Sequence, residues 1–272
     1  MEPQCFGLPL NATLGLDFNG PNAYSSSTIS TTQSRVLMRF PNPVFVALDT
    51  PDLPRALELA QAVKPYVGGL KVGLEFITAL GPDAVRRIVE IGLPVFADVK
   101  FHDIPNTVAG AATAISGLGI TIFNVHASGG EAMMRAAAAA IAPWTPRPLL
   151  IAVTVLTSMD DAALDATGQK GPARDQVARL AALTKASGLD GVVCSAHELA
   201  TVRAVAGPDF LTIVPGIRPA GAALGDQRRV MTPSEARAAG ADILVIGRPI
   251  TAAADPAAAA RAIAQELGIA GI

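Results

Sequence analysis

Short apolar runs alternate with alanine-rich amphipathic stretches from residue 44 to near the end of the chain. Each run is almost continuously apolar, as is typical of strands in a parallel sheet with both faces covered by helices. The eight expected strands are Val44–Leu48, Gly69–Val72, Val95–Val99, Ile120–Val125, Leu149–Val155, Gly191–Cys194, Leu211–Val214 and Ile243–Ile246. Helices are expected at Arg55–Val63, Ala84–Ile91, Glu131–Ala140, Asp175–Ser187, Ala196–Val205, Pro233–Ala239 and Pro256–Leu267. The pattern therefore predicts an α/β protein.

The number of strand–helix units decides between two α/β architectures. Eight units in about 230 residues favour a (β/α)8 TIM barrel, expected as a single domain over residues 40–272. A doubly wound open sheet is the alternative, because its strands have the same apolar character. No G-x-G-x-x-G follows the first run, which favours the barrel.

Residues 1–39 differ from the rest of the chain. The segment from Asn11 to Ser34 is rich in Ser, Thr, Asn and Gly and shows no helical or strand period. It also lacks the basic patch and apolar block of a secretory signal. We interpret it as an unstructured extension upstream of a functional start at Met38. Deletion of residues 1–37 is expected to leave the melting temperature and activity nearly unchanged, and a large loss of either would contradict this interpretation.

Composition narrows the functional classes. The net charge is −2, and the 21 Lys and Arg residues are scattered, which argues against a nucleic-acid partner. The two cysteines, Cys5 and Cys194, suggest neither a disulfide framework nor a metal site, which fits a reducing cytoplasm. No apolar run reaches the ~20 residues of a membrane span. We therefore expect a cytoplasmic protein with no membrane or nucleic-acid partner.

Polar and charged residues follow the expected strands at their carboxyl ends. The active sites of barrel enzymes form at this end of the strands. Purely structural ion pairs would not be expected to gather at one rim, so we predict a functional site there. The residues are Asp49, Lys71, Asp98, Lys100, Asp103, Asn124, His126, Thr157, Ser158, Pro215, Arg218, Gly247 and Arg248.

The most distinctive segment is Phe96–Thr107, which contains an Asp-x-Lys-x-x-Asp pattern. Asp98 and Lys100 are two residues apart and therefore point to the same side of an extended strand. Charges at that position are costly unless they pair or take part in chemistry. Taken alone, the pattern also fits a buried ion pair that only fixes a loop. The polar rim of the expected barrel favours a catalytic array.

The last two strands predict a phosphate site. Gly216–Arg218 and Gly247–Arg248 place backbone N–H groups and guanidinium groups where barrels commonly bind phosphate. Asp226–Arg229 adds donors in the loop after the seventh strand, and Gly216–Arg229 contains enough glycine to act as a lid. The alternative is that Arg218 and Arg248 are ordinary surface residues. We expect a phosphate monoester as the ligand.

These motifs resemble the bacterial orotidine 5′-phosphate decarboxylase family over roughly residues 43–267. Phe96–Thr107 is the most specific of them. It is supported by Val46–Asp49, Leu70–Gly73, Thr154–Ser158, Val214–Pro219, Gly225–Arg229 and Val245–Pro249. The resemblance implies cofactor-independent, metal-independent decarboxylation of orotidine 5′-phosphate (OMP) to UMP and CO2, the final step of de novo pyrimidine biosynthesis.

The resemblance also implies roles for individual residues. Lys100 would protonate C6 of the pyrimidine within a Lys71–Asp98–Lys100–Asp103 array. Asp98 would lie against the substrate carboxylate. Asp103, Ile104 and Thr107 would reach the site from the other subunit of a homodimer. Substrate contacts are implied for Asp49, Lys71, Asp98, Ile104, Thr107, Thr157 (or Ser158), Pro215, Arg218, Gln227, Gly247 and Arg248.

Two other readings of the sequence stay open. One is a sugar-phosphate lyase or decarboxylase of the same barrel superfamily, which would use Mg2+. The other is a barrel that binds a phosphate ligand without catalysis. His102, His126 and His197 show no metal-ligand spacing, and we expect the first two to hydrogen-bond or pack within the rim.

Overall fold

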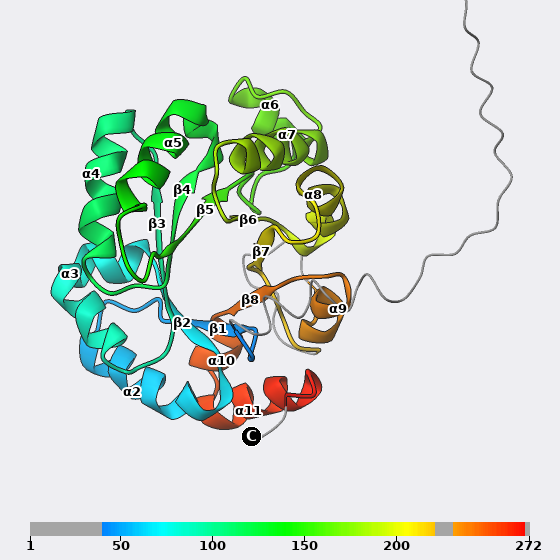
Figure 1. Ribbon diagram of the computed structural model, residues 1–272. Coiled ribbons are helices and arrows are strands. Elements are labelled where there is room, and N and C mark those ends of the chain that lie inside the picture. The colour runs from blue at the N-terminus through cyan, green and yellow to red at the C-terminus, as the bar shows by residue number, and fades with distance from the viewer. Residues whose placement is uncertain (1–39, 221–230, 270–272) are drawn as a thin grey trace, which may run out of the picture.

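Eight parallel strands close into a barrel in the computed structural model, which describes residues 40–220 and 231–269 (Figure 1). The strands follow one another in chain order, and β8 pairs with β1 to close the barrel. Their bounds are β1 Val44–Ala47, β2 Gly69–Val72, β3 Val95–Phe101, β4 Ile122–His126, β5 Leu149–Val153, β6 Gly191–Val193, β7 Leu211–Val214 and β8 Ile243–Ile246. The predicted barrel is confirmed. The open sheet is wrong, because it would leave two unpaired edge strands.

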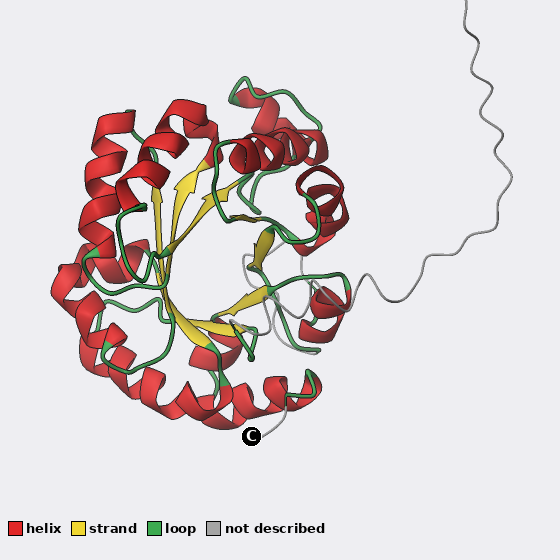
Figure 2. Ribbon diagram, viewed as in Figure 1, coloured by secondary structure: helices red, strands yellow, loops and turns green. Residues whose placement is uncertain are grey.

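The helices form a ring outside the barrel (Figure 2). Their bounds are α2 Leu53–Val63, α3 Leu74–Val89, α4 Pro105–Ser116, α5 Gly130–Ile141, α6 Asp161–Ala166, α7 Ala173–Ala186, α8 Leu199–Ala206, α9 Pro233–Ala238, α10 Arg248–Thr251 and α11 Pro256–Glu266. Among these described residues, no helix is long and apolar enough to cross a membrane. The expected leader, residues 1–39, lies outside the described part of the chain.

Four helices depart from the expected ranges. The second helix was expected to begin at Ala84, but α3 begins at Leu74 and continues through a kink at Gly81, whose φ is 75°, and Pro82. Glycine and proline in sequence normally end a helix, which is why its first half was missed. No bounds were predicted for the helix after the third strand, α4, because its Ala-, Gly- and Thr-rich sequence is only weakly amphipathic. The two short helices α6 and α10 were also not among the expected ranges; α6 precedes α7, and α10 follows β8 directly.

Apolar side chains form two separate layers on either side of the strands. The outer layer packs the strands against the helices. The inner layer fills the barrel with side chains from alternating strand positions, including Phe45, Phe96, Ile151 and Ile213. Phe40 packs edge-on against Phe45, with ring centroids 5.5 Å apart, at the amino-terminal end of the barrel. The interior is therefore filled at that end, and polar groups enter it at the other.

Candidate active site

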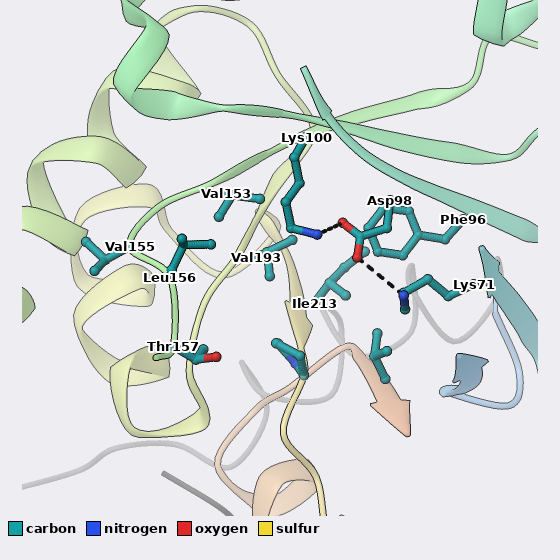
Figure 3. Close-up of a pocket in the computed structure, with 12 residues that line it drawn as sticks. Lys71, Phe96, Asp98, Lys100, Val153, Val155, Leu156, Thr157, Val193 and Ile213 are labelled. Carbon is teal, nitrogen blue, oxygen red and sulfur yellow. Dashed lines mark hydrogen bonds and ion pairs between the residues drawn. The ribbon is translucent and has the colours of Figure 1, made fainter. Parts of the chain in front are cut away.

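A pocket with a volume of about 190 Å³ opens at the carboxyl ends of the strands (Figure 3). Strands and loops from around the barrel supply its walls. Five predicted site residues line it: Lys71, Asp98, Lys100, Thr157 and Pro215. The other lining residues are Phe96, Val153, Val155, Leu156, Val193, Ile213 and Val245. The pocket is therefore apolar apart from one charged side and a few polar groups.

Three charged side chains form the polar side of the pocket. The Lys100 Nζ lies 2.6 Å from Asp98 Oδ1, and the Lys71 Nζ lies 3.4 Å from Asp98 Oδ2 (Figure 3). Lys71 also pairs with Asp49, at 3.0 Å. The Asp98 and Lys71 side chains are 14% and 9% exposed, whereas Asp49 is half exposed. The two ammonium groups therefore flank one buried carboxylate, and Asp49 extends the row toward solvent.

An irregularity in β3 brings Asp98 and Lys100 to the pocket together. Ala97 pairs with Phe123 and Phe101 with Val125, so the register between β3 and β4 shifts between these two pairs. Lys100 has a φ of 51° and is the only non-glycine residue with a positive φ in the described part of the chain. Such a β-bulge redirects side chains and is common beside active sites. The predicted same-side placement is confirmed, but on a bulged strand rather than a regular one.

The charges around Asp98 keep it ionised. Burial alone would raise the pKa of Asp98, but the charges of Lys71 and Lys100 and hydrogen bonds from Lys100 and Asn124 bring it below its ordinary value. A permanently ionised carboxylate between two ammonium groups is costly to build. Asp98 lines a cavity that is otherwise mostly apolar.

Two of the predicted phosphate residues lie near each other beside the pocket. Arg218 is 7% exposed and follows β7, while Arg248 is exposed at the start of α10. Burial, and then the charge of Arg248, lowers the pKa of Arg218. Two guanidinium groups close enough to repel each other provide a favourable site for an anion. Gly247, the residue before Arg248, is half-buried, and Gln227 lies outside the described residues.

The second part of the Asp-x-Lys-x-x-Asp motif does not line the pocket of its own chain. Asp103, Ile104 and Thr107 are all exposed, and the large apolar side chain of Ile104 is 67% exposed. The Asp103 Oδ1 accepts a hydrogen bond from the backbone N–H of Ile104 at 2.6 Å, which fixes this turn before α4. Within one chain, the structure therefore places Asp103 outside the pocket-lining set.

The histidines and the described cysteine have no direct place in the pocket lining. The rings of His102 and His126 lie 5.6 Å apart beside the array. Burial, followed by the charges of His102 and Lys100, lowers the pKa of His126, so that its ring is neutral at pH 7. Cys194 is fully buried, and burial raises the pKa of its thiol far above the ordinary value. It is a core residue.

Two kinds of site residue could not be recognised from the sequence. The apolar lining, such as Val153, Val193 and Ile213, looked like ordinary strand residues. Asn124 was noted at the rim, but its hydrogen bonds to both halves of the Asp98–Lys100 segment were not foreseen. Alternation along each strand could have identified the inward-facing apolar positions.

A closed barrel with a charged pocket at the carboxyl ends of its strands defines the class of (β/α)8-barrel enzymes. Residues 42–263 match the family model described as "Orotidine 5′-phosphate decarboxylase / HUMPS family". A protein of that decarboxylase name from Moorella thermoacetica is 54% identical over 88% of this chain and 98% of its own length. The chain therefore belongs to this family.

Further relatives agree with this assignment. A protein named orotidine 5′-phosphate decarboxylase from Paramagnetospirillum magneticum is 53% identical over 84% of this chain and 99% of its own length. A solved structure of orotidine 5′-phosphate decarboxylase from Lactobacillus acidophilus aligns with a TM-score of 0.72 at 39% identity, over 83% of this chain and 98% of the other.

Proposed function

We propose that this chain decarboxylates OMP to UMP and CO2 without a cofactor, the last step of de novo UMP synthesis, in the cytoplasm. The observation that carries the proposal is the buried Asp98 carboxylate held between the Lys71 and Lys100 ammonium groups at an apolar pocket. The names of the similar bacterial proteins support the same reaction. The charge array explains how it proceeds.

Lys100 acts on the carbon that loses CO2. Departure of CO2 leaves an electron pair at C6 of the pyrimidine, with no carbonyl placed to accept it. An ammonium group fixed beside C6 stabilises this charge and then donates a proton to it, leaving C6–H and a neutral amine that regains a proton from solvent. A preorganised charge is most effective where water is excluded. The valines and isoleucine of the pocket wall provide such surroundings.

Asp98 acts on the leaving carboxylate. A substrate carboxylate placed beside Asp98 meets an ionised group that the two lysines keep charged. This repulsion is relieved when neutral CO2 forms, which favours the transition state over the bound substrate. The apolar side chains of Val153, Val193 and Ile213 suit neutral CO2 better than a carboxylate. The part of the pocket that receives the substrate carboxylate therefore favours neutral CO2 over the bound carboxylate.

Lys71 and Asp49 hold the ribose hydroxyls in this proposal, and Gly73 leaves room for them to do so. A methyl group on Gly73 would lie 2.9 Å from both Asp49 Oδ1 and Lys71 Nζ. Because both atoms end flexible side chains, Gly73→Ala is expected to displace them without unfolding the barrel. We expect kcat/KM to fall about tenfold, or ~1.4 kcal/mol of transition-state binding, with an unchanged melting temperature. Unchanged kinetics in Gly73→Ala would show that this spacing is not needed.

The phosphate is bound at the other side of the pocket by Arg218, Gly247 and Arg248, together with Gln227 from outside the described residues. Thr157 lines the pocket and contacts the base, whereas the adjacent Ser158 is exposed. Pro215 covers the base. Remote binding of the phosphate lowers the barrier at C6 because it holds the pyrimidine against the array.

Arg248→Ala tests this phosphate site. Loss of a charge-assisted contact to a dianionic phosphate is expected to raise KM for OMP by about a hundredfold, equivalent to ~2.7 kcal/mol. Inorganic phosphate should also inhibit the wild-type chain competitively, and this inhibition should weaken in the variant. Steady-state kinetics with OMP and phosphate check both effects. An unchanged KM would remove Arg248 from the site.

The active form is proposed to be a homodimer in which Asp103, Ile104 and Thr107 complete the pocket of the neighbouring subunit. Exposure of an apolar Ile104 beside a charged Asp103 fits a surface that a second copy covers. Leu74, at the start of α3, is also 53% exposed. The fourth member of the alternating array then comes from the partner, which accounts for its distance from the pocket of its own chain.

The test of the reaction is the loss of OMP absorbance with the purified chain, with and without EDTA. We expect UMP to form at the same rate in both. Activity that EDTA abolishes, or activity with a hexulose phosphate and not OMP, would favour the Mg2+-dependent branch of the superfamily. Binding of UMP without any turnover would favour a non-catalytic barrel.

A further inference from the structure

One buried side chain connects the backbone of Lys100 to the carboxylate of Asp98. Asn124 lies on β4 and is 0% exposed. Its Oδ1 accepts a hydrogen bond from the Lys100 N–H at 2.7 Å, and its Nδ2 donates to Asp98 Oδ1 at 2.7 Å. We propose that Asn124 is a positioning residue of the decarboxylation, which sets both the proton donor and the carboxylate opposite the substrate. The inference rests on the proposed function.

The Oδ1 atom of Asn124 supports the β3 bulge. Because the β3–β4 register shifts between Ala97 and Phe101, the ladder is interrupted at Lys100. Its positive φ is a conformation that side-chain-bearing residues rarely adopt without support. The Asn124 Oδ1 supplies an acceptor for the N–H there. Loss of that acceptor would leave a part-buried donor unpaired and allow the bulge, and with it the Lys100 ammonium, to move.

The Nδ2 atom of Asn124 sets the orientation of the Asp98 carboxylate. Asp98 Oδ1 receives both the Asn124 amide and the Lys100 ammonium, while Oδ2 faces Lys71 at 3.4 Å. A carboxylate held only by the flexible side chains of two lysines could rotate about its χ2 angle, which is a soft torsion. The amide on a strand removes this freedom. It is also uncharged, so it stabilises the ionised form of Asp98 without cancelling the charge that the mechanism uses.

The titratable neighbours of this unit come from three strands, β2, β3 and β4, and from the loops after β1 and β3. Lys71 faces Asp98 from β2, with Asp49 of the first β-α loop beyond it, and Lys100 faces it from β3. His126 follows on β4, and His102 lies next to His126. The pocket residues from β5 to β8 are apolar: Val153, Val193, Ile213 and Val245. A change at position 124 is therefore felt mainly by Asp98 and Lys100.

The test compares Asn124→Ala with Asn124→Asp. Asn124→Ala removes both hydrogen bonds and adds no charge. We expect kcat to fall about a hundredfold, while the Kd for UMP, which has no carboxylate at C6, changes less than about threefold. A residue needed only for folding would instead lower the amount of active protein and leave the kcat of each active site unchanged.

Asn124→Asp gives a signature that a purely structural role does not. At low pH, the carboxylate introduced at position 124 and the Asp98 carboxylate are expected to share one proton. The pair then carries one negative charge and one bridging hydrogen, as the Asn124–Asp98 pair does in the wild type. We expect the ratio of kcat in Asn124→Asp to kcat in Asn124→Ala to rise about tenfold from about pH 8 to about pH 5.5. A constant ratio, with a kcat near that of the wild type in both variants, would overturn the inference.

Asn42 provides the matched control at the opposite end of the barrel. Its Oδ1 also accepts a backbone N–H, that of Val44, whereas its Nδ2 donates to the backbone carbonyl of Tyr66 and not to a carboxylate. Asn42→Ala and Asn42→Asp should change the melting temperature without changing kcat or its pH dependence. Equal kinetic effects in the Asn42 and Asn124 pairs would contradict a positioning role.

The proposed function and the role of Asn124 can fail separately. A wild-type chain that does not convert OMP overturns the proposed function. The role of Asn124 is then decided by 13C NMR titration of the Asp98 carboxyl group in the wild type and in Asn124→Ala. A higher pKa of Asp98 in the variant supports the inference, and an unchanged pKa overturns it.

Discussion

Replacement of Lys100 by alanine is expected to abolish OMP turnover while UMP binding persists. The variant loses the ammonium group closest to Asp98, at 2.6 Å, and with it both the charge that stabilises C6 and the proton that C6 receives. Loss of one preorganised charge costs ~10²–10³ in rate, and loss of the general acid adds to this, so kcat should fall by at least about 10⁴-fold. Single-turnover kinetics and calorimetric titration with UMP measure the two effects.

Lys185→Ala is the matched control for this result. Lys185 lies exposed on α7 and does not line the pocket, so its loss should leave kcat and KM unchanged. A Lys100→Ala variant that keeps a tenth of wild-type kcat would contradict the proton-donor role. Loss of UMP binding together with turnover would point to misfolding of the β3 bulge, which circular dichroism and the melting temperature would reveal.

Mixing two inactive variants is expected to restore activity if the site is shared between subunits. Lys100→Ala and Asp103→Ala each disable every site in their own homodimers. In a mixed dimer, one pocket carries both changes and the other carries neither. After random exchange of subunits, about half of the dimers are mixed and about a quarter of all sites are intact. Activity should therefore rise from near zero to about a quarter of the wild-type value.

The control for subunit mixing uses two residues of the same pocket. Lys100→Ala mixed with Asp98→Ala should recover no activity, because each mixed dimer then has one defect in each site. Recovery in this control, or no recovery with Asp103→Ala, would contradict the proposed division of the motif. Size-exclusion chromatography before and after mixing confirms that the subunits are dimeric and exchange.

Much of the fold could be read from the sequence because strands buried on both faces have an unmistakable pattern. The β2 strand, Gly69–Val72, and the β8 strand, Ile243–Ile246, have the bounds that their apolar runs predicted. The ends of β3 and β5 differ by two residues, because Lys100 and Phe101 continue the pairing beyond the apolar run and Thr154 and Val155 do not. Apolar character reports burial, whereas strand ends depend on hydrogen bonds between strands.

Part of the candidate site was predicted because its charged residues stand out in the sequence beside apolar runs. Asp98 and Lys100 were recognised from spacing, and the predicted rim brought Lys71 to them. The expectation that structural ion pairs would not gather at one rim needs a correction, because two such pairs, Arg203–Asp242 and Arg147–Asp190, both lie at the opposite end of the barrel. These differ in that each aspartate also accepts a backbone N–H, so the carboxylate is used to join strands.

The β3 bulge could not be predicted from the sequence. It depends on Asn124, 24 residues further along the chain, accepting the Lys100 N–H. Spacing within a motif shows which side chains share a face, but a change of register is decided by the neighbouring strand. The same limit applied to the apolar wall, whose residues are indistinguishable in sequence from the rest of the barrel core.

The most direct test of the charge array is exchange of the C6 proton of UMP in D2O, followed by 1H NMR. By microscopic reversibility, a site that stabilises charge at C6 during decarboxylation also removes the C6 proton of the product. The wild-type chain should exchange this proton well above the rate in buffer, with or without EDTA, and Lys100→Ala should not. Exchange that is equal in the two proteins, or absent from an active wild-type chain, would contradict the account.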